Sequence, residues 1–293
     1  MPTIALVTTA AARPVDDDLP LLLSALGSAG ATAVAADWDD PAVQWNTFDL
    51  AVMRCPWDYT RRLPEFLGWL DRVETATRVL NSPAVVRHNI DKHYLAELRT
   101  LGLPVVPTMF LEPLEDTGKL RPWLDERWHL SDCVVKPCVG AGSQDALRFG
   151  PTDRPAACTH AQRLLAAGRA AMVQPYLQRV DSDGETALIF LDGLYSHSIR
   201  KGPLLRTNVA AGPAMFAPEN IAARQPAADE LALAQAIVAT YAPKRLLYAR
   251  VDVLRDDEGA PCLLELELTE PSLFFALGPG SAQRLAQAIL RRL

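Results

Sequence analysis

Alternating polar and apolar positions near the end of the chain predict a β-hairpin. Residues 246–254 (LLYARVDVL) and 262–273 (CLLELELTEPSL) alternate at period two, as half-buried strands do, and RDDEGAP between them has the composition of a turn. If the connecting loop has an even number of residues, Asp252 faces Leu263, and Glu265 is its diagonal cross-strand neighbour at roughly 7 Å. The leucines expected to face a core are residues 264, 266 and 268.

The other face of this hairpin gathers acidic side chains. Asp252, Glu265 and Glu267 share it with Arg250. Two like charges about 4 Å apart repel by roughly 4 kcal/mol at an effective dielectric of about 20, so such a cluster needs a cation. Oxygen ligands without histidine or cysteine favour magnesium or manganese over zinc. The alternative is a solvent-facing surface on which Arg250 is a salt-bridge partner.

The first 87 residues show strand and helix patterns in alternation. This alternation predicts a parallel sheet with crossover helices, whose ligands lie beyond the carboxyl ends of the strands. No GxGxxG is present, so a dinucleotide is not indicated. The expected strands are 4–9, 31–37, 48–54 and 78–82, and the expected helices are 19–30 and 63–74.

Two loops at the carboxyl ends of these strands carry candidate binding residues. The candidates are Arg13, Asp16, Asp17 and Asp18 in the first loop and Arg54, Trp57, Asp58 and Tyr59 in the second. For the two aromatic residues the alternative is packing beneath a loop. For the acidic run the alternative is a solvated helix start.

Two lysines in the middle of the chain lie where a phosphate would bind. A helix is expected to begin near Asn89 or Asp91 and to stop at Gly102, which places Lys92 in a first turn whose dipole favours anions. A plain surface lysine is the alternative. Lys136 ends an apolar strand and precedes a loop whose backbone N–H groups can approach an anion, although this order is not that of a P-loop. That loop contains Gly140, Gly142 and Ser143.

A strand interrupted by proline follows. Residues 170–180 (AAMVQPYLQRV) contain Pro175, which leaves backbone groups free to meet a planar ring such as adenine across residues 173–177. A hairpin with its turn at residues 192 and 193 comes next. Further helices are expected around 122–128, 160–169, 226–240 and 281–292.

The composition is that of an ordinary globular protein. The chain has 293 residues, 49% hydrophobic and 22% charged, and its length suggests two or three subdomains. A net charge of −6 without a basic block argues against nucleic acid as a partner. We expect no membrane span, and we expect the N-terminus to be a first strand rather than a signal peptide. The five cysteines form no CxxC pair and are expected to be reduced thiols of a cytoplasmic protein.

Several of these features occur in the order found in a known superfamily. Lys92 at a helix start, VVKP before a glycine loop, MVQPYL, Glu185, and RxD followed by ExE together resemble the ATP-grasp superfamily over residues 88–275. The resemblance implies an α/β N-terminal parallel-sheet domain followed by α+β ATP-grasp domains. The expected boundaries are 1–87 for the N-terminal domain, 88–174 for the small lid subdomain and 175–293 for the subdomain with the metal site.

The resemblance also implies roles for individual residues. Lys92 and Lys136 are expected to contact the phosphates of ATP, with residues 140–143 as a mobile lid. Glu185 is expected to meet the ribose or a phosphate. The expected adenine pocket consists of Gln174, Tyr176 and Leu177, and the expected magnesium ligands are Asp252, Glu265 and Glu267.

Two positions depart from the pattern of the superfamily. Glu267 stands where asparagine is common, which adds negative charge and favours a second ion. Ala187 stands where many relatives have an arginine two residues after the residue matched by Glu185. The replacements considered for this anion contact are Arg200, Lys201 and Arg206.

The chemistry that the resemblance implies is carboxylate activation. ATP converts a carboxylate into an acylphosphate, which a nitrogen nucleophile then attacks, and no nucleophilic side chain is needed. Arg250 and Lys201 are the expected catalytic residues, with Arg250 stabilising the phosphoryl group or the tetrahedral intermediate.

At finer grain, WDYT, NIDKxYL, SHSIRKGP and ELELTEPSL resemble the D-cycloserine synthetase branch. That branch implies an amino-acid-like substrate, O-ureido-D-serine, and a monomer or homodimer is expected. The candidate substrate contacts are Arg54, Trp57, Asp58, Tyr59, Asp17 and Glu270, with Arg250 as a further partner for a zwitterion. The alternatives are another amino-acid or peptide ligase and a nucleotide-binding regulator without turnover. His197 is a candidate for proton handling, but packing within its hairpin is favoured.

Overall fold

The computed structural model describes residues 1–113, 118, 120–128, 131–205 and 220–293. Three sheets make up this part of the chain, and they fall within the three predicted segments except that one strand, β8, ends at Pro175. The segment boundaries themselves stay a prediction. None of the helices in the described ranges is long and apolar enough to cross a membrane.

The N-terminal sheet is parallel, as predicted. Its strand order is β2-β1-β3-β4, and the sequence places a helix in the crossover after β1 and another after β3. Its elements are β1 (Thr3–Thr8), α1 (Asp18–Ser28), β2 (Thr32–Asp37), β3 (Leu50–Cys55), α2 (Leu63–Ala76) and β4 (Arg78–Leu80). Short 3-10 turns at Trp45–Thr47 and Trp57–Arg61 flank β3.

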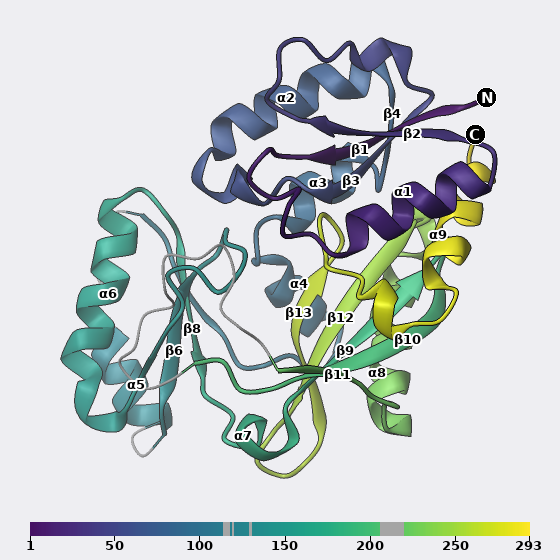
Figure 1. Cartoon of the computed structure of the whole chain (residues 1–293). Coiled ribbons are helices and arrows are strands. Elements are labelled where there is room, and N and C mark those ends of the chain that lie inside the picture. The colour runs from purple at the N-terminus through teal and green to yellow at the C-terminus, as the bar shows by residue number, and fades with distance from the viewer. Residues whose placement is uncertain (114–117, 119, 129–130, 206–219) are drawn as a thin grey trace.

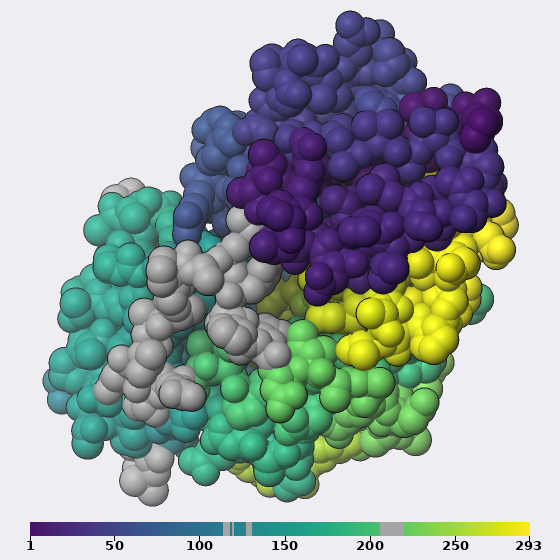
Figure 2. Space-filling model, in the orientation of Figure 1, coloured from purple at the N-terminus to yellow at the C-terminus, as the bar shows by residue number. Residues whose placement is uncertain are grey.

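The second sheet forms a separate lobe, drawn in teal in Figures 1 and 2. It is antiparallel in the order β5-β8-β6-β7, and α5 and α6 bury an apolar core against it that includes Leu124, Val135 and Leu164. Its elements are β5 (Met109–Leu111), α5 (Leu120–Trp128), β6 (Cys133–Pro137), β7 (Leu147–Phe149), α6 (Arg154–Ala166) and β8 (Ala171–Pro175). A 3-10 turn at Pro151–Asp153 leads into α6.

The third sheet is antiparallel in the order β11-β10-β9-β12-β13. It contains the predicted acidic hairpin as β12 and β13, beside the predicted hairpin of β9 and β10. Its elements are α7 (Val180–Asp183), β9 (Glu185–Leu191), β10 (Leu194–Lys201), β11 (Ile221–Ala223), α8 (Ala228–Thr240), β12 (Tyr248–Arg255), β13 (Pro261–Glu267) and α9 (Ser281–Leu290). Two 3-10 turns, Ala242–Lys244 and Phe275–Leu277, complete this region.

The acidic hairpin differs from the prediction by a β-bulge. Asp252 lies directly opposite Glu265, whereas the next residue, Val253, lies opposite Leu263, so β13 has one extra residue at this point. Leu264 is that residue, and it lines the cleft together with Glu265 instead of facing the core. The even-loop register was therefore wrong, and the bulge places the two carboxylates closer together than the predicted diagonal pair.

The helix expected to carry Lys92 is divided in two. Helix α3 (Pro83–Asn89) begins after Ser82, whose hydroxyl accepts a hydrogen bond from the Val85 N–H at 3.4 Å, and α4 (Tyr94–Thr100) follows. Lys92 lies in the turn between the helices, so its predicted place in a first helical turn was wrong. Asn89 does not cap a helix, because its side-chain amide bonds to the backbone of β13.

The N-terminal and third sheets form one packed body. Helix α1 lies along α9, and a common core joins residues from both regions, as the contact between the purple and yellow parts in Figures 1 and 2 shows. The buried Asn81 side chain accepts from the Leu247 N–H at 2.6 Å. It donates to the Tyr248 and Leu268 carbonyl oxygens at 3.0 and 2.8 Å. Three buried hydrogen bonds of one amide thus connect the N-terminal sheet to β12 and to the chain beyond β13.

Replacing this amide tests how strongly the two sheets depend on each other. We expect Asn81→Ala to lower the free energy of unfolding by about 3 kcal/mol, because three buried backbone groups lose their partners. Urea unfolding followed by circular dichroism measures this change. The exposed Asn46→Ala is the control and should stay within about 0.5 kcal/mol of the parent. Equal stability of the two variants would contradict the proposed connection.

Candidate active site

The predicted site residues converge on one cleft of about 580 Å³. All three sheets contribute to its wall, through the loops of the N-terminal sheet, the chain after β6 and β8, and the faces of β12 and β13. The predicted residues that line it are Asp16, Asp17, Asp18, Trp57, Tyr59, Lys92, Lys136, Gly140, Gly142, Ser143, Gln174, Tyr176, Leu177, Glu185, Lys201, Arg250, Asp252, Glu265, Glu267 and Glu270. Their individual roles stay predictions.

The acidic face of β12 and β13 is connected to basic groups by a chain of ion pairs. Arg250 Nε lies 2.9 Å from Asp252 Oδ1, and the same guanidinium contacts Glu267. Lys201 Nζ lies 2.9 Å from Asp252 and 2.5 Å from Glu185. Lys92 Nζ lies 3.0 Å from Glu265. The cluster is thus held together by cations from the chain itself.

These cations do not fully compensate the negative charge. Burial opposes ionisation of Asp252, yet Arg250 and Lys201 hold its pKa well below the usual range. For Glu267, burial raises the pKa to about 8, and repulsion from Glu265 and Asp252 acts in the same direction against the attraction of Arg250. A further cation would favour the charged form of Glu267. These carboxylate oxygens carry negative charge that is not fully balanced, and such a group of oxygen ligands is suited to a hard divalent ion.

The two lysines predicted to contact phosphate differ in their surroundings. Lys92 Nζ donates to the Gly140 carbonyl at 2.8 Å and pairs with Glu265. Lys136 is also in the cleft, but among the described residues no carboxylate lies within ion-pair distance of it. Burial lowers the pKa of Lys136 from its ordinary value. A buried ammonium without a close anion is a suitable partner for a phosphate group.

The glycine loop after β6 lies over the cleft and contacts the N-terminal domain. Gly142 has a φ of +61°, a conformation that glycine adopts without strain. Arg61 Nε donates to Gln144 Oε1 at 3.1 Å, which joins this loop to the turn after β3. The sequence analysis did not identify either residue, because no local pattern connects positions 83 residues apart.

The predicted adenine region lies where β8 ends. Gln174 is buried and its amide donates to Thr108 Oγ1 at 2.9 Å. The guanidinium of Arg148 lies 3.4 Å from the centre of the Tyr176 ring. Val134, Leu177, Leu254 and Leu264 supply apolar wall on this side. Apolar side chains of this kind are suited to contact with a purine ring.

Two of the predicted substrate contacts do not line the cleft. Arg54 is 1% exposed, pairs with Asp16 at 2.9 Å and donates to the Pro271 carbonyl. Asp58 accepts from Trp38 Nε1 at 2.9 Å and pairs with Arg62 at 3.2 Å. Other parts of the chain therefore use both side chains, and their contact with substrate stays a prediction.

The acidic run before α1 has a structural role that the sequence did not indicate. The Asp18 carboxylate accepts backbone hydrogen bonds from Leu273, Phe274 and Phe275 at 2.6 to 3.0 Å. Together with Arg54, it fixes the chain that follows β13 against the N-terminal domain. These partners are about 255 residues apart, so periodicity and turn chemistry give no sign of them.

Arg200, Lys201 and Arg206 were considered as substitutes for the arginine that many relatives have at the position of Ala187. Of the two that the structure describes, Lys201 lines the cleft and Arg200 does not. Ala187 lies opposite Asp252 in the sheet, and Lys201 pairs with that aspartate. Arg200 donates to the backbone carbonyls of Asp183 and Ser182, and an anion contact by it stays a prediction. Arg206 lies outside the described residues.

His197 packs within the molecule, as favoured. It is 9% exposed, and its Nε2 lies 2.8 Å from the Leu273 carbonyl. Gly278 lies against its ring, where a Cβ atom at that position would come within 2.5 Å of His197 Cγ. Burial lowers the pKa of this imidazole, which favours the neutral form.

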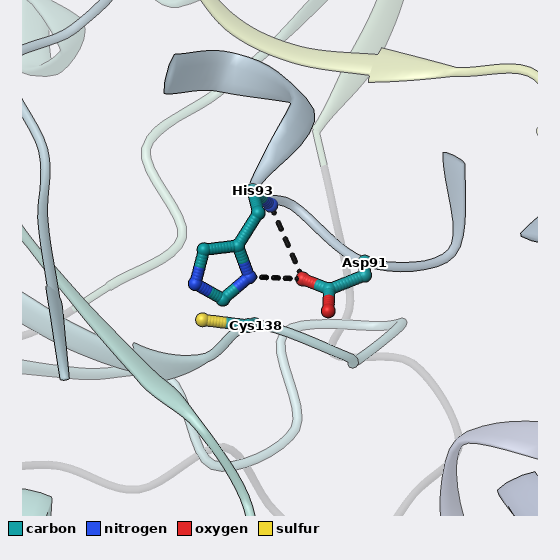
Figure 3. A group of neighbouring side chains, drawn as sticks. All are labelled: Asp91, His93 and Cys138. Carbon is teal, nitrogen blue, oxygen red and sulfur yellow. Dashed lines mark hydrogen bonds and ion pairs between the residues drawn. The ribbon is translucent and has the colours of Figure 1, made fainter. Parts of the chain in front are cut away.

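A second group of polar side chains flanks Lys92 outside the cleft (Figure 3). His93 Nδ1 lies 2.6 Å from Asp91 Oδ1, and the Cys138 thiol lies beside the ring. His93 Nε2 lies 2.8 Å from Glu112 Oε1. Burial opposes its charge, but the two carboxylates raise the pKa of His93. We interpret the group as an imidazolium held between two carboxylates, with neither ring nitrogen left free for a metal.

Comparisons with known proteins agree with this geometry. The N-terminal domain of D-cycloserine synthetase DcsG, as a family, matches residues 4–81. Cycloserine biosynthesis protein DcsG from Streptomyces lavendulae is 39% identical over 299 residues, which cover 100% of this chain and 99% of that protein. The crystal structure of D-cycloserine synthetase DcsG aligns with a TM-score of 0.92 at 39% identity, with 99% of each chain covered.

A more distant structure shares the fold. The ATP-grasp ligase PsnB, solved with a minimal precursor, aligns with a TM-score of 0.66 at 19% identity, covering 100% of this chain and 99% of its own. With a full-length relative at 39% identity and an ATP-grasp architecture, this chain belongs to the D-cycloserine synthetase family of ATP-grasp ligases.

Proposed function

We propose that this ligase uses ATP to cyclise O-ureido-D-serine to D-cycloserine. The γ-phosphoryl group of ATP passes to the substrate carboxylate, giving an acylphosphate and ADP. The ureido nitrogen bound to oxygen attacks the acyl carbon and releases phosphate as the ring closes. Water then removes the carbamoyl group as carbon dioxide and ammonia, which balances the reaction.

One observation carries this proposal. A single cleft brings the three carboxylates of β12 and β13 together with Lys92 and Lys136, which come from different parts of the chain. Positioning and charge compensation are what phosphoryl transfer from ATP needs. Solved structures of the PsnB ligase hold Mg and ADP. The full-length relative acts in cycloserine biosynthesis, as its name states, which favours the cyclisation over other ligase reactions.

Asp252, Glu265 and Glu267 are the residues that would hold magnesium, and manganese is a possible substitute. The bound ion would supply positive charge to the phosphate oxygens of ATP. Glu267 in place of the common asparagine makes the ligand set more negative, which favours a second ion. Each of these carboxylates already contacts Lys92, Lys201 or Arg250, so charge compensation in this cluster is shared between side chains and metal.

The basic side chains act on the phosphates and the activated carboxylate. Lys136 is suited to a phosphate contact because it is half-buried in the cleft and lacks a close anion. Arg250 Nη1 donates to the Ser272 carbonyl at 3.1 Å, which orients its guanidinium between the metal carboxylates and the chain after β13. From there it would stabilise negative charge on the transferring phosphoryl group or on the tetrahedral intermediate. Lys201 would assist in the same region.

The partners proposed are ATP and an amino-acid-like small molecule. The described cysteines are all free thiols, in agreement with a cytoplasmic setting in which ATP is available. A monomer or homodimer remains the expected assembly. Another amino-acid or peptide ligase is the alternative activity, since PsnB was solved with a precursor. A regulator that binds ATP without turnover is the alternative from another class.

A substrate panel separates these possibilities. We expect ADP and phosphate release with ATP and magnesium to depend on O-ureido-D-serine, and mass spectrometry to detect D-cycloserine. Other amino acids and short peptides in the panel should give much less ADP. Turnover with a different amino acid or peptide would favour the alternative ligase. ATP binding without ADP release across the panel would favour the regulator.

Lys136 provides a test of the phosphate contacts. We expect Lys136→Met to raise the KM for ATP about 10- to 100-fold, because one charge-assisted contact is lost. The fold should be retained, since the replacement removes a buried charge from a site without a close anion. Steady-state kinetics measures the effect, and the exposed Lys244→Met, near the far end of β12, is the control. An unchanged KM and kcat in Lys136→Met would contradict the assignment.

A further inference from the structure

Glu270 differs from the other buried or half-buried carboxylates that line the cleft. Asp252, Glu265, Glu267 and Glu185 each pair with a lysine or arginine. For Glu270, no basic side chain of the described residues lies within ion-pair distance, and its close partner is the Tyr59 hydroxyl. The cleft therefore presents one half-buried carboxylate that its own cations do not compensate.

Such a carboxylate is unfavourable in the unliganded protein. Burial raises the pKa of Glu270 to about 7, while the Tyr59 hydrogen bond and the more distant Lys92 and Arg250 oppose the shift. Glu265 acts in the same direction as burial. Lys92 and Arg250 are themselves engaged with other carboxylates. A buried acid that costs stability at a concave site is a sign of ligand binding.

The backbone around Glu270 is held rigidly. Trp57 Nε1 donates to the Glu270 carbonyl at 3.0 Å, and the Tyr248 hydroxyl donates to the Thr269 carbonyl at 2.8 Å. Asp18 binds the backbone N–H groups of residues 273–275. The N-terminal domain thus fixes the position of the carboxylate before any ligand arrives, which lowers the entropic cost of binding.

We propose that Glu270 and Tyr59 form the subsite for the ammonium group of a zwitterionic amino acid. This inference rests on the proposed ligase function and specifies its substrate class as one with a free primary amine. The Tyr59 hydroxyl interacts with Glu270, and a phenolic oxygen can also accept a hydrogen bond from the ammonium group. Trp57 and Phe274 also line the cleft, and aromatic rings can contribute cation–π attraction to an ammonium group.

This assignment orients the substrate. With the ammonium group at Glu270, the carboxylate of the amino acid can be directed toward Arg250 and the phosphate end of the cleft, where activation takes place. Arg54 and Asp58 are turned away from the cleft, so they do not compete for the zwitterion. Glu270 also lies beyond the paired face of β12 and β13, since β13 ends at Glu267.

The proposal predicts a pH dependence of substrate affinity. An ammonium ion binds the ionised carboxylate, so binding below a pH of about 7 releases a proton from Glu270. The apparent KM for the amino acid should therefore fall as the pH rises through about 7 and then level off. The charged and titratable groups that face Glu270 are Tyr59, Lys92, Tyr248, Arg250 and Glu265, and all of them remain in a Glu270→Gln variant.

The test combines two substitutions, one in the protein and one in the ligand. The ligands are O-ureido-D-serine and its analogue with a hydroxyl group in place of the amine. We expect Glu270→Gln to raise the KM for the amine about 10- to 100-fold, to leave the KM for ATP unchanged, and to lose the pH dependence. The hydroxyl analogue should bind the parent protein about as weakly as the amine binds Glu270→Gln. Its KM should not rise further in Glu270→Gln. Glu258→Gln, at an exposed turn, is the control.

Other outcomes overturn the proposal. Independent, additive losses from the two changes would show that the amine is bound elsewhere. A fall in kcat alone, with an unchanged KM for the amine, would show that Glu270 acts on protons rather than on the ammonium group. Tyr59→Phe should give a smaller rise in the same KM, and an unchanged value would exclude Tyr59 from the subsite.

Two controls keep the test independent of folding and of the proposed reaction. Without ligand, Glu270→Gln should have a Tm equal to or above that of the parent, because a buried unpaired acid is removed, whereas a structural role would lower it. If O-ureido-D-serine is not turned over, calorimetry with D-serine and its hydroxy analogue D-glycerate in the presence of ADP and magnesium still applies. Preference for D-serine that disappears in Glu270→Gln supports the subsite, and equal binding of both compounds contradicts it.

Discussion

The structure depends on the close placement of carboxylates on two paired strands. The bulge in β13 puts Asp252 directly opposite Glu265, while Arg250 lies opposite Glu267. This arrangement is costly in a buried sheet unless positive charge comes from several directions. Lys92 supplies it from the turn before α4 and Lys201 from the end of β10. The need to compensate one acidic face thus explains why distant segments meet at this cleft.

The N-terminal sheet has a second role besides lining the cleft. Its side chains complete the hydrogen bonding of backbone that belongs to the third sheet and to the chain beyond it. Asn81 and Asn89 reach β13 and its neighbours, and Asp18 reaches the segment after β13. Trp57 and Glu270 meet at one wall of the cleft. The position of this wall therefore depends on segments near both ends of the chain.

Much of the fold was predictable because it depends on local periodicity. Alternation at period two predicted the acidic hairpin, and the succession of strands and helices predicted the parallel sheet. The register was not predictable, since one bulged residue changes which side chains face each other. The partners of Arg54 and Asp58 were not predictable, because a loop sequence does not show which residues 20 to 217 positions away a side chain contacts. The order of several weak motifs carried the family assignment, which a full-length relative confirmed.

The bonds from Asp18 and Arg54 to residues 271–275 limit how members of this family can exchange parts. A chimaera that takes its first 87 residues from one relative and the remainder from another would mismatch a contact that spans almost the whole polypeptide. Substitutions near residues 271–275 must therefore be matched by substitutions in the N-terminal segment that contacts them. Recombination after residue 87 would separate these matched residues, whereas paired substitutions on both sides of the contact would preserve it.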